Sequence, residues 1–183
     1  KKSLEEFITE NQADLIKKNG DFYADAQQAF ETAAKVEQQP LMMKYLAGQK
    51  QKIMTGEIAG VPFKIKMDNY KKGQFIADLK YMASLRSPNM FEPMVKYWKY
   101  IAQGAVYQEI VYQNTGKRLP VYLDIATKET PAHLAVAEIK QYDLDEALET
   151  VKALAPRFQQ IKNGEIEPNR CDEYGCDYCT TTH

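Results

Sequence analysis

The chain has 183 residues, of which 44% are hydrophobic and 27% are charged, and its formal net charge is −1. This size and composition predict one soluble globular domain over 1–183, with a real core. No apolar run reaches membrane-spanning length and no signal peptide is visible, so we expect a cytoplasmic protein without a membrane partner. The near-neutral charge argues against a generally cationic nucleic-acid coat and leaves room for a local basic groove. Because the chain begins Lys-Lys without a methionine, we expect that residues precede it.

Apolar residues at helical spacing predict three helices at the start of the chain, at about 3–18, 22–37 and 41–48. Pro40 separates the second helix from the third. The methionine and aromatic residues of the third helix are expected to pack in the core rather than to line a ligand pocket.

Three strands should follow, one at 51–59 and two that form an antiparallel hairpin within 61–80. Glycine tolerates a positive φ, so Tyr70–Gly73 is a turn signal between the hairpin strands. Alternation places apolar residues of the first hairpin strand on one face and charged residues on the other (Val61, Phe63, Ile65 and Met67 against Lys64, Lys66 and Asp68).

The hairpin is expected to place Asp68 near its mouth, with Asp78 and Lys80 side by side on one face. Charged groups are costly to bury on strands unless they are paired or bound to a metal. Two converging carboxylates suit Mg²⁺ or Mn²⁺, and the lysine can orient a metal-bound water or stabilise transition-state charge. The structural alternative is a surface salt bridge between Asp78 and Lys80, with Asp68 only capping the turn.

A long helix is predicted over 91–114, in which Gln103 and Tyr107 are four residues apart and share one face. An amide and a phenol so placed can bind a phosphate or hold an attacking water. The aromatic residues that open this helix could stack on a base of single-stranded DNA, but we favour their packing on the sheet.

Two further strands are predicted at 119–126 and 132–139, followed by a last helix that begins with a capping box of Asp143 and Glu146. The resulting order is three helices, three strands, a helix, two strands and a helix. It predicts a mixed α/β (α+β) core, a central mixed sheet flanked by helices.

In their order, Asp68, then Asp78-Leu79-Lys80, then Gln103-x-x-x-Tyr107, these motifs resemble the RecB-type branch of the PD-(D/E)XK nuclease superfamily. The run from about Lys44 to Cys179 is similar in particular to prophage-encoded exonuclease VIII-like proteins. The resemblance implies a restriction-endonuclease-like fold. It also implies a Mg²⁺- or Mn²⁺-dependent exonuclease that acts on linear DNA ends in phage or prophage recombination or repair. A recombination annealing protein is then a candidate partner, and oligomers are allowed.

The resemblance also implies roles for single residues. Asp68 and Asp78 would hold the metal, with the Leu79 carbonyl as a further ligand, and Lys80 would orient the attacking water. Gln103 and Tyr107 would position phosphate or water. Glu57 is a candidate third acidic ligand, although a solvated strand residue is the more ordinary interpretation. A histidine or glutamate ligand from a helix before the sheet has no match here, and we expect it upstream of the chain.

All three cysteines, Cys171, Cys176 and Cys179, lie in a tail at about 165–183. So close a group differs from a disulfide scaffold, and clustered thiolates are typical metal ligands. The resemblance implies a [4Fe–4S] cluster whose fourth cysteine precedes the chain. The alternatives are a Cys₃His zinc site completed by His183 and a tail without metal. A metal would clamp the tail to the body.

Two other classes of function stay open. The first is a catalytically inactive nuclease fold that binds DNA or protein. The second is a zinc-stapled interaction domain without nuclease ancestry.

Overall fold

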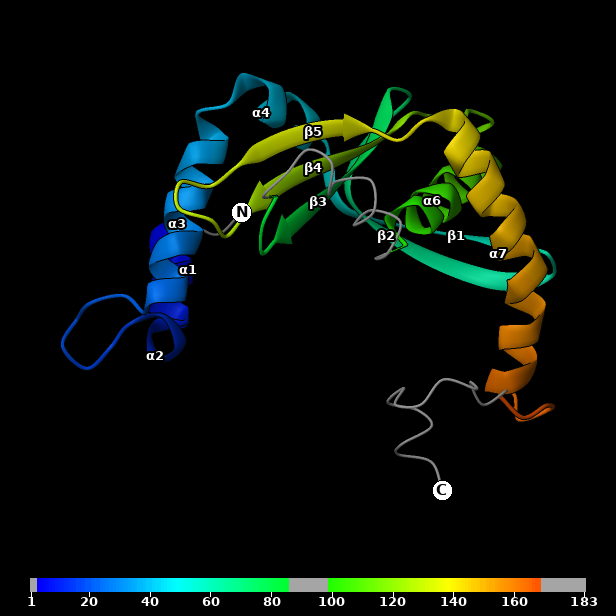
Figure 1. Ribbon diagram of the computed structural model, residues 1–183, viewed down its shortest axis with the longest axis horizontal. Helices are drawn as coiled ribbons and strands as arrows, with labels where there is room; N and C mark the ends of the chain where they lie inside the picture. The colour runs from blue at the N-terminus through cyan, green and yellow to red at the C-terminus, as the bar shows by residue number, and fades with distance from the viewer. Residues whose placement is uncertain (1–2, 86–98, 169–183) are drawn as a thin grey trace.

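The computed structural model describes residues 3–85 and 99–168 (Figure 1). The elements in chain order are α1 (Leu4–Glu10), α2 (Gln12–Leu15), α3 (Ala24–Glu37), α4 (Pro40–Leu46), β1 (Gln49–Ile58), β2 (Val61–Lys71), β3 (Phe75–Met82), α6 (Tyr100–Thr115), β4 (Val121–Thr127), β5 (Leu134–Glu138) and α7 (Gln141–Lys162). The predicted order is confirmed, except that the first expected helix is two short ones. None of the helices in the described ranges is long and apolar enough to span a membrane.

Three predicted helix boundaries were wrong. Asn11 ends α1, and its side-chain amide donates to the Phe7 carbonyl, which divides the expected helix 3–18. Of the helix predicted over 91–114, α6 begins at Tyr100, after Lys99 in a left-handed conformation (φ 57°) that a right-handed helix cannot continue, and residues 91–98 lie outside the described residues. Helix α7 begins after Lys140 without a side-chain cap, so Asp143 lies within its first turn and forms no capping box.

The five strands form one sheet in the order β1-β2-β3-β4-β5. Strands β3 and β4 are parallel, and the other neighbours are antiparallel. The parallel pair needs a crossover, and α6 lies within it. The predicted central mixed sheet is therefore confirmed.

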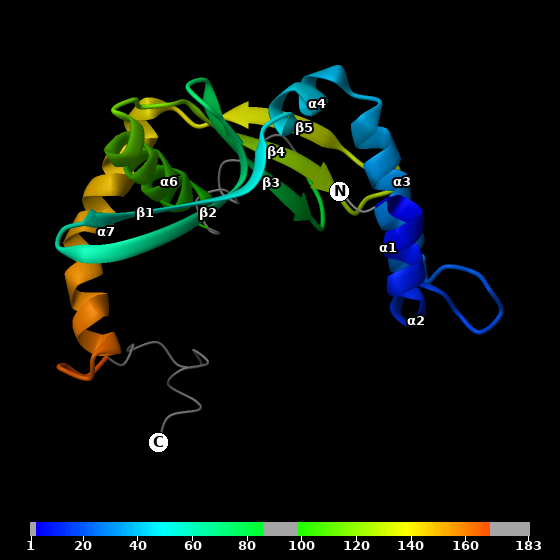
Figure 2. The same ribbon diagram turned by 180° about the vertical axis from the view of Figure 1, so that it is seen from behind.

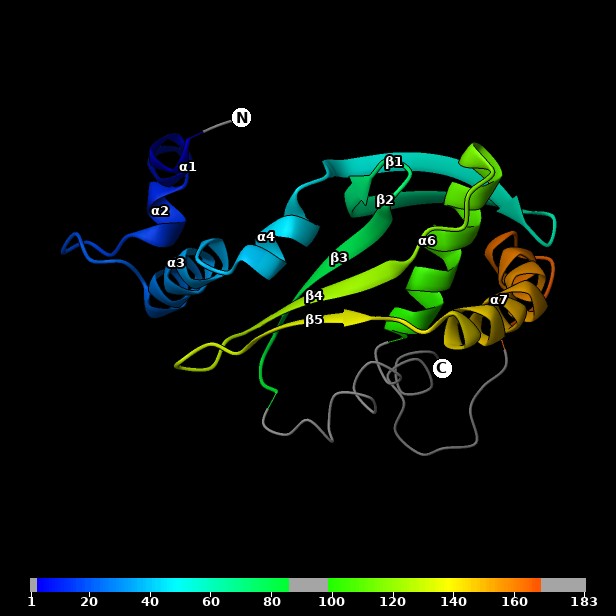
Figure 3. The same cartoon turned by 90° about the horizontal axis from the view of Figure 1, so that it is seen from above.

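Helices cover the sheet in two groups (Figure 3). Helices α3 and α4 contact β4, whereas α6 packs on β1 and β2 and α7 packs on α6. Gly104 lets α6 come close to its neighbours, because a Cβ there would lie 3.1–3.2 Å from side-chain carbons of Ile139, Leu144 and Val121. The core between these layers is apolar and fully enclosed (Met67, Ile76, Ile110, Val111, Val121, Ile125 and Leu144 are at most 1% exposed).

Strand β2 is shared unequally between its two neighbours. It pairs with β1 from Gln49↔Tyr70 to Ile58↔Val61, but with β3 only from Asn69↔Ala77 to Lys71↔Phe75. The predicted turn between β2 and β3 is confirmed, with Gly73 at φ 71°. Beyond the short ladder the β1–β2 ribbon leaves β3 and runs to α6 and α7 (Figure 2). This divergence opens the sheet at Asp68.

Candidate active site

Asp68 lies where β2 and β3 separate. Its Oδ2 accepts a hydrogen bond of 3.1 Å from the N–H of Leu79, two residues beyond the last β3 residue of the ladder, Ala77. Its Oδ1 accepts a bond of 2.9 Å from the Gln51 amide on β1. The carboxylate therefore holds the open end of the hairpin, rather than capping the turn at Gly73.

Asp78 is buried on β3, with 4% of its surface exposed. Its Oδ2 forms an ion pair with the Lys80 ammonium, and no other donor among the described residues bonds to this oxygen. Burial raises the pKa of Asp78 above its ordinary value of 3.8, the Lys80 ammonium opposes that rise, and the neighbouring Asp68 carboxylate adds to it. Two carboxylates against one ammonium leave an excess negative charge in a partly desolvated place.

Lys80 begins a chain of side-chain hydrogen bonds that runs onto α6. Its ammonium donates to Gln103 Oε1 at 2.8 Å, and Gln103 Nε2 donates to the Tyr107 hydroxyl at 2.8 Å. The Tyr107 hydroxyl donates in turn to the Lys66 carbonyl of β2 at 3.0 Å. The ring of Tyr100 lies 4.4 Å from the Lys80 ammonium, a cation–π contact. Gln103 and Tyr107, which were predicted to share one face of the helix, are thus linked by hydrogen bonds to Lys80.

The phenol of Tyr107 is held in its neutral form. Burial raises its pKa above 10.0, and the negative charge of Asp78 raises it further, while the bond from Gln103 lowers it. A neutral phenol both donates and accepts a hydrogen bond, which is how Tyr107 is used here.

Glu57 is not brought to this site. It pairs with Pro62 near the far end of the β1–β2 ribbon, whereas Asp68 is contacted by Gln51. The backbone of Glu57 instead exchanges two hydrogen bonds with the Gln113 amide of α6, at 3.0 and 2.8 Å.

The carboxylate oxygens of Asp68 and Asp78 could supply part of the coordination of a hard divalent cation. Within residues 3–85 and 99–168, no three His, Cys, Asp or Glu side chains form a metal-binding group. Asp68 and Asp78 would therefore share a Mg²⁺ or Mn²⁺ with backbone, water and phosphate oxygens, as Mg²⁺ sites commonly do. The excess negative charge of the two carboxylates over the Lys80 ammonium favours such an ion. The predicted Leu79 carbonyl ligand lies between the two key residues of β3, and its role stays a prediction.

The cysteine cluster of Cys171, Cys176 and Cys179 lies outside the described residues, as does His183. The iron–sulfur and zinc interpretations therefore stay predictions.

The sequence reasoning missed Asp124. This residue of β4 is fully buried, and among the described residues no donor is hydrogen-bonded to either carboxylate oxygen. Burial raises its pKa to about 7, an effect that Lys50 opposes and the charge of Asp78 increases. It is the register partner of Leu79, so it faces the side of the sheet opposite to Asp78. In the sequence, the feature that could have indicated this buried carboxylate is a single acidic residue within the largely apolar run 119–126.

Comparisons with known proteins agree with this geometry. Residues 1–182 match a family model described as "PDDEXK-like domain of unknown function (DUF3799)". The crystal structure of a protein from Eubacterium rectale, described as a "putative exonuclease", superposes with a TM-score of 0.84. It is 42% identical, and the alignment covers 99% of this chain and 69% of that one. Among curated proteins, none matches the chain.

Proposed function

The chain belongs to the family of PDDEXK-like domains, and we propose that it is a metal-dependent DNA exonuclease of the RecB-type, exonuclease VIII-like branch. One observation carries the proposal: Asp68 and Asp78 lie on neighbouring strands at the point where these separate, with Lys80 paired to Asp78. The E. rectale protein, whose description is "putative exonuclease", supports the same class.

Each residue of the site has a separate proposed role in phosphodiester hydrolysis. Asp68 and Asp78 would bind Mg²⁺ or Mn²⁺, which polarises a phosphate oxygen and lowers the pKa of a bound water. Lys80 has three ammonium protons, two of which are directed to Asp78 and Gln103, and the third can orient the attacking water. Gln103 and Tyr107 hold the lysine through hydrogen bonds and would contact the phosphate.

The wider setting of this activity is also part of the proposal. The enzyme would act at linear DNA ends in phage or prophage recombination or repair, in the cytoplasm, together with an annealing protein. The three clustered cysteines would hold a [4Fe–4S] cluster, or else zinc. Visible absorption of the purified protein separates these two, because thiolate–iron clusters are coloured and zinc sites are not.

The test follows Mg²⁺-dependent loss of an end-labelled linear duplex, beside a closed circular duplex, with the full-length protein. We expect loss of the linear DNA alone, a decrease of about 10²-fold or more in Lys80→Ala, and none in Lys152→Ala, an exposed lysine of α7. Asp78→Ala should be inactive and should no longer bind Mn²⁺. Full activity of Lys80→Ala would refute the role of the lysine. Absence of any hydrolysis by a folded protein would instead favour the inactive DNA- or protein-binding module.

A further inference from the structure

A groove of about 890 Å³ lies beside the candidate active site, between β2, α6 and α7. Apolar side chains from all three elements form most of its lining (Phe63, Ile65, Val106, Val151, Leu154 and Phe158). Gln103 and Tyr107 also line it, so the groove is continuous with the hydrogen-bond chain of Lys80.

The charges of this groove have one sign. Its lining contains four exposed lysines, Lys64, Lys66, Lys99 and Lys162. None of the described residues that line it is acidic. The whole chain has a net charge of −1, so this is a local concentration of positive charge and not a property of the surface in general. An anionic occupant is therefore favoured.

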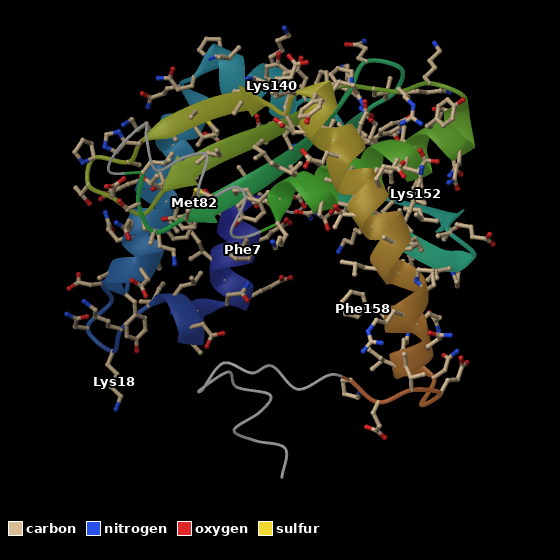
Figure 4. The ribbon with its side chains drawn as sticks, turned by 45° about the vertical axis from the view of Figure 1, so that its right-hand side comes forward. Phe7, Lys18, Met82, Lys140, Lys152 and Phe158 are labelled. Atoms are coloured by element: carbon tan, nitrogen blue, oxygen red, sulfur yellow. The ribbon has the colours of Figure 1, made fainter. Side chains whose placement is uncertain are left out.

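Two large apolar residues of the lining, Leu154 and Phe158, are open to solvent. Phe158 is 63% exposed and Leu154 is 45% exposed, although both are large hydrophobic residues. Figure 4 shows Phe158 on α7, on a different side of the helix from Lys152, which does not line the groove. Exposed aromatic and aliphatic surface beside lysines is the combination with which proteins bind single-stranded nucleic acid, through base stacking and phosphate contacts.

We propose that this groove binds an unpaired strand of DNA and leads its end to Asp68 and Asp78. The inference extends the proposed nuclease function and rests on it. In a duplex the base faces are stacked inside and only sugar and phosphate face outward, so the apolar walls would have no partner. An unpaired strand presents both base faces and phosphates. A second copy of the chain, docked symmetrically, would bring the same four lysines against these four.

Binding can be measured without hydrolysis, by fluorescence anisotropy of a labelled oligo-dT and of a blunt duplex in EDTA. We expect the full-length protein to prefer oligo-dT. Phe158→Ala should weaken that binding about 5- to 150-fold, the range for loss of one stacked base. Tyr142→Ala is the matched control, because Tyr142 is an aromatic residue of α7 that is 73% exposed and lies outside the groove lining.

The lysines are tested through salt dependence. The double variant Lys64→Ala/Lys162→Ala should lower the slope of log K against log salt concentration by about 1.4, because each contact with a single-stranded phosphate contributes about 0.7. The double variant Lys140→Ala/Lys152→Ala removes the same charge from α7 and its N-cap, outside the groove, and should keep the slope.

Three results would overturn the proposal. In the first, substitution of Phe158 and of these lysines leaves the binding of oligo-dT unchanged. In the second, the same substitutions weaken the binding of the duplex equally. In the third, Phe158 is needed for self-association of the protein, and that self-association excludes the oligonucleotide. The outcome is separable from that of the proposed function. Groove-dependent binding without Mg²⁺-dependent hydrolysis would refute the nuclease alone, and hydrolysis without groove-dependent binding would refute the groove alone.

Discussion

The Asp68 carboxylate accepts the Leu79 N–H at 3.1 Å, on the residue that directly follows Asp78. One side chain therefore bridges β2 and β3 just beyond the end of their ladder, and it links Asp68 to the residue after Asp78. Because Oδ2 is used in this bond and Oδ1 accepts from Gln51, Asp68 has a structural role in addition to its proposed role as a metal ligand.

Two substitutions of Asp68 should separate these roles. Asp68→Asn keeps an oxygen acceptor for Leu79 but removes the charge, so we expect loss of Mn²⁺ affinity in calorimetry with little change in stability. Asp68→Ala should lose the metal and also about 0.5–1.5 kcal/mol of unfolding free energy in urea denaturation, since the bond to Leu79 disappears. Equal stability of the two variants would show that this hydrogen bond contributes nothing.

Tyr107→Phe should reduce hydrolysis about 10-fold. The change removes the hydroxyl that links Gln103 to the Lys66 carbonyl, so Gln103 holds Lys80 less firmly. Because the pKa of Tyr107 is raised, the phenol stays protonated at neutral pH, and the loss should be constant from about pH 6 to 9. Rates of the two proteins across this range provide the measurement. A loss that grows with pH would indicate that ionised tyrosine takes part.

Asp124 should make folding stability depend on pH. Its pKa is 3.8 ordinarily and about 7 in the folded protein, so its stabilising effect is complete below about pH 4 and is lost as the pH rises through 7. Asp124→Asn removes the ionisable group. We expect this variant to have a shallower slope, because Asp78 with its raised pKa still contributes, and to exceed the parent by about 1–3 kcal/mol in unfolding free energy at pH 8. The exposed Asp25→Asn is the control, and an unchanged slope in Asp124→Asn would contradict the assignment.

Gly104→Ala should destabilise the protein although alanine is the better helix former by about 1 kcal/mol. The new Cβ would lie 3.1–3.2 Å from side-chain carbons of Ile139, Leu144 and Val121, and overpacking of this kind typically costs about 1–3 kcal/mol. A double-mutant cycle with Val121→Ala tests the cause, since the second change makes room for the first. Additive effects would show that no clash exists.

Local patterns were sufficient for much of the fold. The alternation from Val61 to Met67, the glycine at 73 and the four-residue spacing of Gln103 and Tyr107 each depend on neighbours within one element. These predictions agree with the observed burial, turn and hydrogen bonds. The spacing of Asp78 and Lys80 similarly predicts two side chains on one face, and they are in contact.

Features that depend on pairing between segments distant in the sequence could not be predicted from local patterns. Glu57 lies away from Asp68 because the register pairs it with Pro62, whereas Gln51 contacts Asp68. The bond from Leu79 to Asp68 exists only because β2 leaves β3 after three paired residues, which no local pattern indicates. Asp124 was overlooked since its burial depends on helices and strands that lie far away in the sequence.

Helix α6 joins two parts of the molecule that the sheet barely connects. Near its end, the amides of Gln113 and Asn114 bind the β1 backbone at Glu57 and Thr55, and near its start Gln103 holds Lys80 of β3. The helix thus connects the β1–β2 ribbon, which contains Asp68, to strand β3, which contains Asp78. A change in those amide contacts would alter the separation of the two carboxylates, and with it the ionic radius that they could accommodate, while Asp68 and Asp78 themselves stayed the same.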